Sequence, residues 1–515
     1  MSNVILTNIM KVRDYSCAPV SLPILASYVE HNTEADAEIF DMTLEMAKTQ
    51  SYKKSLRNLE KRLDNCEVLG VHTITPNYYL VVNMLRGLKK IHGKLPTVVL
   101  GGPHATALPT QILEQCKGLV DVIVIGPGER QLAEIVNIGG TPLEDIPNIA
   151  YREGRKIKLS KRKLMEPFDE KIERKFLEFC MTPAFSKRMG KLKELSDISR
   201  YSCPNQCDYC SCVRVRGGTF NRDPNIVAEE IAEINDRKKL ENIIFVDDNH
   251  FLDFNHAKAL NKALVEQGIE ASKTSYADLA TFTKSNLQSI KKMNYHALFV
   301  GRDFVTNRLA RIYGRRLAGR IRDVESEKKI LDRAARTIPL TISYIIPAPH
   351  YTMEEVRRTV DDMCDYCWQG VRYGILSPLP GTKIRDKLLK EKLLNSWAGN
   401  CDKLNGRSLD FTFRFLDKDV ETWAYSNAVE EIKLSYYEKS HKGTLELLRF
   451  GKENLLIAAA ITYSGDKLDS CINKFSKHWS EEQISASKDY LKVSKTYMKD
   501  KDFVSFCKKT IKNYT

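Results

Sequence analysis

The stretch Ser199-Arg-Tyr-Ser-Cys203-Pro-Asn-Gln-Cys207-Asp-Tyr-Cys210 places three cysteines at the spacing C-x3-C-x2-C, directly after an apolar, strand-like run. Thiolates so spaced can converge on one metal centre, and they suit zinc or an iron–sulfur cluster. A structural zinc site needs four closed ligands, usually as two separated pairs. Three ligands leave one iron of a four-iron cluster open for reaction. The stretch therefore predicts an oxygen-sensitive cluster on Cys203, Cys207 and Cys210, with a non-catalytic iron–sulfur or zinc protein as the alternative.

The remaining cysteines predict no second site. Cys212 lies two residues past Cys210, an awkward step for binding the same cluster. Cys364 and Cys367 form a C-x-x-C pair within a helical pattern, where core packing is the expected role. The chain has 13 cysteines and no export signal, which argues against a disulfide framework.

Apolar runs alternate with helical patterns on the C-terminal side of residue 194. Six such β/α units predict a partial barrel of TIM type, in which functional groups follow the strand ends. The expected strands are Leu195–Ser199, Ile243–Val246, Lys273–Ala277, Leu298–Gly301, Leu340–Ile346 and Val371–Leu376. The residues after these ends include Cys203, Asp247, Asp248 and Asp303.

The N-terminal part has its own α/β pattern. Val- and Ile-rich strands alternating with helices predict a parallel, doubly wound, Rossmann-like sheet, which binds ligands at the carboxyl ends of its strands. The expected strands are Val4–Ile9, Ala37–Phe40, Glu67–His72, Thr97–Leu100 and Val120–Ile125, with one long charged helix from Leu44 to Asn65. Polar or glycine-rich turns follow three of them, at Thr73–Asn77, Gly101–His104 and Gly126–Glu129.

These patterns divide the chain into four parts. Residues 1–145 form the Rossmann-like domain, and residues 146–190 form a linker with a small β-hairpin near 151–158. Residues 191–395 form the partial barrel, and residues 396–515 form a helical C-terminal domain.

Composition narrows the class of protein. The net charge of +14 could suggest a nucleic-acid binder, but the lysines are spread over helix-like and loop stretches without an RNA or DNA motif. Salt-dependent binding to RNA would support that alternative. No apolar run approaches the ~20 residues of a membrane span, and the start lacks the regions of a signal peptide. We therefore expect a cytoplasmic protein without a membrane span and without nucleic acid as a partner.

The cysteine motif, with Tyr209 before its last cysteine, resembles the radical S-adenosylmethionine (SAM) superfamily across about residues 190–390. The resemblance implies that the open iron chelates SAM, which electron transfer cleaves to methionine and a 5′-deoxyadenosyl radical. It implies further that Tyr209 lies beside the adenine and that Asp303 binds the ribose hydroxyls. Asp247 and Asp248 are then expected near the methionine moiety. Gly301-Arg-Asp303 is a shortened form of the family's pattern, in which a glutamate is usual.

The three turns, placed before such a barrel, resemble the cobalamin-binding domain of the cobalamin-dependent branch. That branch's Asp-x-His-x-x-Gly loop is missing, because the first strand leads into Met10-Lys-Val-Arg-Asp-Tyr. Gly-Pro-Gly-Glu also replaces the commoner Gly-Glu-Gly-Glu at 126–129. The resemblance implies that the turns surround the corrin ring and the nucleotide tail. The implied contacts are Thr75, Asn77, Gly101, Gly102, His104, Gly126, Gly128 and Glu129.

With both cofactors, the resemblance implies methylation of an unactivated carbon in a small-molecule, lipid or peptide substrate. The alternative within the branch is non-methylating ring formation, ring contraction or oxidation. The cluster needs a low-potential electron, so a flavodoxin or ferredoxin type of reductant and anaerobic handling are expected.

Overall fold

The computed structural model describes residues 3–10, 21–137, 142–163, 193–201, 203–212, 219–317, 320–367, 369–395, 412–427, 458–459, 461–463, 465–477, 481 and 485. The chain divides into two compact units. The first comprises Met1–Gln206, Cys210–Tyr276 and Leu379–Thr382, and the second comprises Cys207–Tyr209, Ala277–Pro378 and Lys383–Thr515.

The first unit begins with a seven-stranded sheet in the order β2-β1-β3-β4-β5-β6-β7. Strands β1 to β5 are parallel, which confirms the predicted doubly wound sheet. β6 and β7 form the predicted hairpin and pair antiparallel, so the sheet extends past residue 145, where the domain was expected to end. The strands are β1 (Asn3–Asn8), β2 (Asp36–Asp41), β3 (Val68–His72), β4 (Thr97–Gly101), β5 (Val122–Val124), β6 (Ile149–Glu153) and β7 (Lys156–Leu159).

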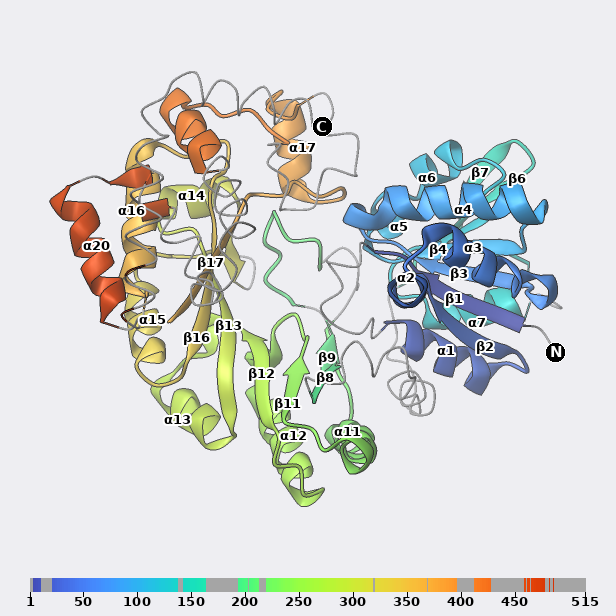
Figure 1. Ribbon diagram of the computed structural model, residues 1–515, viewed down its shortest axis with the longest axis horizontal. Coiled ribbons are helices and arrows are strands. Elements are labelled where there is room, and N and C mark those ends of the chain that lie inside the picture. The colour runs from blue at the N-terminus through green and yellow to red at the C-terminus, as the bar shows by residue number, and fades with distance from the viewer. Residues whose placement is uncertain are drawn as a thin grey trace. The chain divides into compact units, whose positions relative to one another are not determined.

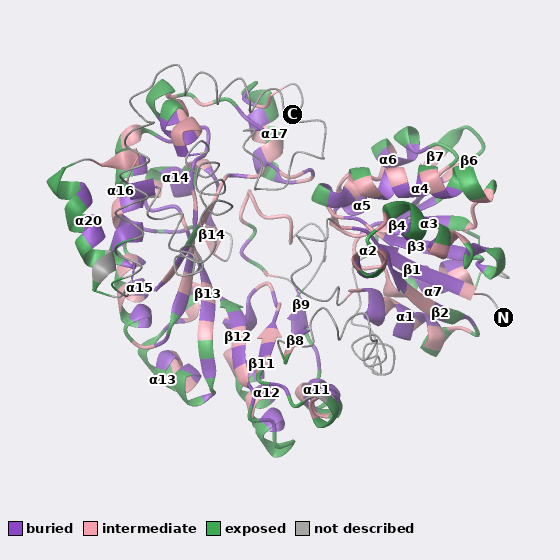
Figure 2. Ribbon diagram, in the orientation of Figure 1, coloured by how far each residue is buried: buried purple, intermediate pink, exposed green. Residues whose placement is uncertain are grey.

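Helices cover both faces of this sheet (Figure 1), and the central strands β1, β3 and β4 between them are mostly buried (Figure 2). α1 (Ser21–Asn32) and α7 (Glu129–Val136) supply one core, with Leu22, Val29 and Leu132 against the strands. The opposite core includes Leu85 and Ile112, from α4 (Tyr78–His92) and α6 (Pro109–Gln115). α5 (Pro103–Ala107) lies between β4 and α6. The chain therefore leaves β1 and β3 toward opposite faces, which opens a binding crevice where these strands end.

The prediction of one long helix from Leu44 to Asn65 is wrong. The segment forms α2 (Met42–Thr49), α3 (Tyr52–Glu60) and a short 3-10 turn, η2 (Leu63–Asn65). Gln50 adopts a left-handed φ of 53°, and the Ser51 hydroxyl accepts a hydrogen bond from the Lys54 amide at 3.3 Å. A serine that caps a new helix favours a break over continuation of the old one.

A second, six-stranded sheet has the order β17-β16-β13-β12-β11-β8, so its strands follow one another in chain order. The strands pair in parallel within β8–β11–β12 and within β13–β16–β17. This confirms the six predicted β/α strands. They are β8 (Glu194–Asp197), β11 (Asn242–Phe245), β12 (Ser272–Ala277), β13 (Tyr295–Asp303), β16 (Leu340–Ile345) and β17 (Gly370–Gly374). The intervening helices are α11 (Pro224–Lys238), α12 (Phe254–Glu266), α13 (Lys284–Lys292), α14 (Asn307–Ile312), α15 (Lys328–Ala335) and α16 (Met353–Asp365), and α17 (Lys383–Lys390) follows β17.

Several sequence-based expectations fall on residues outside the described ranges. Most of the expected helical domain 396–515 does, although α20 (Asp466–Ser476) is described and forms an ion pair with α16 between Lys474 and Asp365. Residues 11–20 and 164–192 also lie outside. The four domain boundaries therefore stay a prediction. Among the described helices, none has both the length and the apolar character that crossing a membrane requires, and the cytoplasmic location stays a prediction.

Candidate functional site

The cysteine loop follows β9 (Arg200–Tyr201), which pairs with β10 (Phe220–Asn221). Cys203, Cys207 and Cys210 are half-buried and carry free thiols. Among the described residues, no three His, Cys, Asp or Glu side chains already stand close enough to hold a metal ion. The assignment of these three cysteines as ligands therefore rests on their spacing.

Cys207 has a hydrogen-bond donor at its sulfur. The backbone N–H of Arg316 donates to Cys207 Sγ at 3.4 Å, from the short strand β14 (Arg316–Leu317). Burial raises the pKa of Cys207, while the Arg316 backbone acts in the opposite direction. An amide that donates to a thiolate stabilises its negative charge, as the outer shell of a metal site does.

Cys212 is a hydrogen-bond donor in this structure. Its Sγ donates to Asp248 Oδ1 at 3.2 Å. Its hydrogen bond with Cys210 and its burial raise the pKa of Cys212 well above the ordinary value, so the group stays a neutral thiol. Since the metal ligand is the thiolate, this environment favours a supporting role for Cys212.

Asp247, just after β11, is fully buried, and its carboxylate is hydrogen-bonded to other residues of the protein. Its carboxylate accepts hydrogen bonds from the Ser199 amide (2.7 Å) and hydroxyl (2.6 Å), the Arg200 amide (3.1 Å) and His250 Nδ1 (2.5 Å). Burial alone would raise the pKa of Asp247, but the hydrogen bonds from His250 and Ser199 outweigh it and lower that pKa. Asp247 therefore fixes the backbone that leads into the cysteine loop.

Tyr209 and Asp303 are in direct contact. Tyr209 Oη donates to Asp303 Oδ2 at 2.7 Å, and Arg315 Nε donates to the same oxygen at 3.1 Å. Arg315 is itself held by Glu327, 2.6 Å from its Nη1. Asp303 sits at a bulge in β13 with a left-handed φ of 54°, and its carboxylate is 20% exposed. Asp303 thus keeps acceptor capacity for a hydroxyl-bearing ligand.

A cavity of about 450 Å³ lies in the first unit, where β1, β3, β4 and β5 end. Five of the predicted contacts line it: Gly101, Gly102, Gly126, Gly128 and Glu129. Gly102 has a φ of +96°, and a Cβ there would lie 2.5 Å from the Thr73 carbonyl oxygen. A Cβ on Gly101 would meet no atom within 4 Å, so its backbone faces open space.

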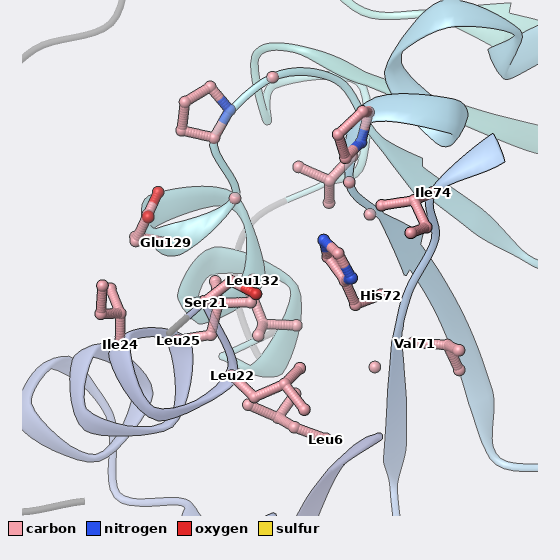
Figure 3. A pocket seen from close by; sticks show the side chains of 18 of the residues that line it. Leu6, Ser21, Leu22, Ile24, Leu25, Val71, His72, Ile74, Glu129 and Leu132 are labelled. Carbon is pink, nitrogen blue, oxygen red and sulfur yellow. The ribbon is translucent and has the colours of Figure 1, made fainter. Parts of the chain in front are cut away.

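The cavity wall is otherwise largely apolar (Figure 3). A bulky flat ligand can therefore lie against bare backbone on one side and hydrocarbon on the other. The apolar side chains include Leu6, Leu22, Ile24, Leu25, Val71, Ile74 and Leu132.

Three predicted contacts are not among the residues that line this cavity. Thr75, Asn77 and His104 are buried. Thr75 Oγ1 lies 3.1 Å from His104 Nδ1, and the His104 ring packs on Tyr78 with 4.4 Å between ring centroids. Asn77 Oδ1 accepts from the Ile74 amide at 2.8 Å. These residues shape the turn after β3.

Sequence reasoning missed His72, which lines the cavity and reaches into it (Figure 3). Burial lowers the pKa of His72 to about 4, so its imidazole is neutral at pH 7. The available signal was its position, because His72 closes a buried strand at the sheet edge where ligands bind.

Two family models match the chain. The B12 binding domain covers residues 7–136, and the radical SAM superfamily covers residues 199–363. A protein of Pyrococcus horikoshii, named an uncharacterized methyltransferase, is 24% identical over 386 residues, which are 73% of this chain and 79% of that protein.

Solved structures share the fold. TsrM from Kitasatospora setae, a radical SAM methyltransferase solved with cobalamin and a [4Fe–4S] cluster, superposes with a TM-score of 0.65 at 18% identity, over 76% of this chain and 78% of that one. OxsB, a cobalamin-dependent SAM radical enzyme solved with aqua-cobalamin, gives a TM-score of 0.66 at 14% identity, over 96% of this chain and 84% of that one. These likenesses confirm the predicted order of domains in the fold, with the B12-binding domain before the radical SAM domain.

Proposed function

We propose that this chain, which belongs to the cobalamin-dependent radical SAM enzymes, methylates an unactivated carbon of a small-molecule, lipid or peptide substrate. The observation that carries the proposal is the presence of both domains in one chain. The matched domains confirm the predicted cofactors: a [4Fe–4S] cluster, SAM and cobalamin. The methyltransferase named in Pyrococcus horikoshii supports methyl transfer as the reaction.

The described residues fit these cofactors. The bare backbone at Gly101 leaves room for a corrin ring, and the largely apolar wall offers it hydrocarbon to pack against. The Arg316 amide, aimed at Cys207 Sγ, suits a sulfur that carries charge as a cluster ligand. When bound, the cluster and SAM supply a radical that removes a substrate hydrogen atom, and cobalamin supplies the methyl group.

The chain's own residues hold and orient these groups. Cys203, Cys207 and Cys210 hold the cluster. Tyr209 orients Asp303, whose carboxylate would accept hydrogen bonds from the ribose hydroxyls of SAM. Asp248 lies after the second strand of the radical SAM domain and takes part in binding the methionine moiety.

Asp247 contributes indirectly, since its carboxylate already holds Ser199, Arg200 and His250. Asp247 thereby positions the cysteine loop. A flavodoxin or ferredoxin type of protein supplies the electron, and the chain's net charge of +14 favours an acidic partner of this kind.

The test begins with anaerobic purification in the presence of cobalamin, followed by measurement of iron, sulfide and cobalt. The loaded protein is then incubated with a chemical reductant and SAM carrying a deuterated methyl group. A deuterated methyl group on the extracted cobalamin, found by mass spectrometry, supports methyl transfer. Release of 5′-deoxyadenosine with no label on cobalamin supports the non-methylating alternative instead.

A further inference from the structure

We infer that the His72 imidazole ligates the cobalt of cobalamin from the side of the sheet. His72 is the last residue of β3 and lies in register with Gly101 on β4. Its ring therefore stands at the carboxyl ends of two central strands, beside the glycine turn that opens the cavity (Figure 3). The inference rests on cobalamin binding but not on methyl transfer.

The glycine turn leaves room for the ring. A Cβ added to Gly102 would lie 2.9 Å from His72 Cδ2 and 3.0 Å from Nε2. Any side chain at Gly102 would therefore push the imidazole away from its position. The absence of a side chain at Gly101 keeps the neighbouring backbone open as well.

The imidazole of His72 has a nitrogen lone pair available to bind a metal ion. Within the described residues, neither ring nitrogen forms a hydrogen bond or an ion pair with another protein group, and burial is the sole cause that shifts the pKa of His72. The His72 side chain is half-buried and faces the cavity, so a ligand in the cavity can reach its ring nitrogens. A neutral imidazole is also the form that binds metal ions.

His104 offers a contrast within the same module. It also follows a strand of the sheet, but Thr75 and Tyr78 engage its ring, and it is buried outside the cavity lining. Among the described residues that line the cavity, His72 carries the one imidazole. A hydrogen bond from His72 to an amide side chain of the corrin is the competing role, and the test separates the two.

The experiment uses electron paramagnetic resonance of the full chain loaded with cob(II)alamin. An axial nitrogen splits each cobalt line into three when it is ¹⁴N and into two when it is ¹⁵N. Protein grown with ¹⁵N-histidine and loaded with unlabelled cobalamin should give two-line splitting. Three-line splitting in that sample would assign the axial nitrogen to the cofactor's own benzimidazole and overturn the inference, as would the absence of nitrogen splitting.

Two variants show which histidine causes the nitrogen splitting. His72→Ala should lose the histidine splitting, whereas His92→Gln, on α4 and paired with Glu60, should keep it. Retention of the splitting in His72→Ala would overturn the inference. The isotope experiment on the unmodified chain decides the question if His72→Ala does not bind cobalamin. Cobalt content is measured separately, so a failure of cobalamin binding is distinguished from a failure of ligation.

Discussion

Tyr209 Oη and Asp303 Oδ2 are joined by a hydrogen bond of 2.7 Å, which ties the cysteine loop to the bulge at the end of β13. The two residues are 94 positions apart in the chain. Arg315 donates to the same carboxylate oxygen and is anchored by Glu327. The carboxylate is thus held in one orientation by two donors from different segments.

Replacing Tyr209 with phenylalanine tests this arrangement. The change removes one donor and leaves Arg315 in place, so we expect SAM to bind about fivefold more weakly, equivalent to about 1 kcal/mol. Equilibrium dialysis with radiolabelled SAM under anaerobic conditions measures the dissociation constant. Tyr79→Phe, at an exposed position on α4, is the matched control. An unchanged dissociation constant for Tyr209→Phe would remove Tyr209 from the SAM site.

The backbone amide of Arg316 should raise the reduction potential of the cluster. Arg316→Pro removes the N–H that donates to Cys207, so we expect the reduction potential to fall by about 40 mV, the equivalent of a hydrogen bond of about 1 kcal/mol. Arg316→Lys keeps both the N–H and the positive charge and should leave the potential unchanged. Iron content is measured first, because proline also restricts the preceding residue. Equal shifts in a redox titration of the two variants would contradict the role of the N–H.

The two neighbouring glycines after β4 should respond differently to alanine. Gly102→Ala meets the Thr73 carbonyl and needs a positive φ, so we expect a loss of about 1–3 kcal/mol in the stability of the cofactor-free protein. Gly101→Ala meets no protein atom and should fold normally, but its methyl group enters the cavity and should weaken cobalamin retention. Thermal unfolding and cobalt content measure the two effects. Normal cobalamin retention by Gly101→Ala would show that the corrin does not approach this backbone.

Asp247→Asn should destabilise the protein by about 3 kcal/mol, because it breaks a buried network that includes His250. The pKa of Asp247 is lowered in the folded state. Its contribution is therefore fully present above the ordinary aspartate pKa, near ~4, and is lost as the pH falls below that value toward the folded-state pKa.

Unfolding measured from pH 7 to pH 3 checks this dependence, since the variant should lose less stability with acid than the parent. Asp248→Asn, whose carboxylate is half-buried, is the comparison. If both variants lose as much stability at acidic pH as the parent does, Asp247 is not the cause of that loss.

The strands were predictable because each is a short Val- and Ile-rich run between polar turns. The strand expected at Thr97–Leu100, for example, is observed at Thr97–Gly101. The break at Gln50 was not predictable, because glutamine carries no preference for the left-handed conformation that it adopts there. Tertiary packing and the Ser51 cap decided that segment.

The site was predictable where one local segment makes it. Gly101 and Gly126 line the cavity because glycine-rich turns end their strands. Thr75 and His104 were expected at the cofactor, but they are not among the residues that line the cavity, and their side chains contact each other across 29 positions of the chain. The contact between Arg316 and Cys207 joins residues 109 positions apart, and no local pattern encodes such a pairing.

β7 forms one edge of the first sheet, and its composition affects how the protein can be assembled. Edge strands present unpaired backbone groups that can template pairing with another chain, and lysines discourage that pairing. β7 carries the exposed Lys156 and also Lys158, which pairs with Glu153 at 2.6 Å. A newly made chain that waits for its cofactors is thereby protected against aggregation through this edge.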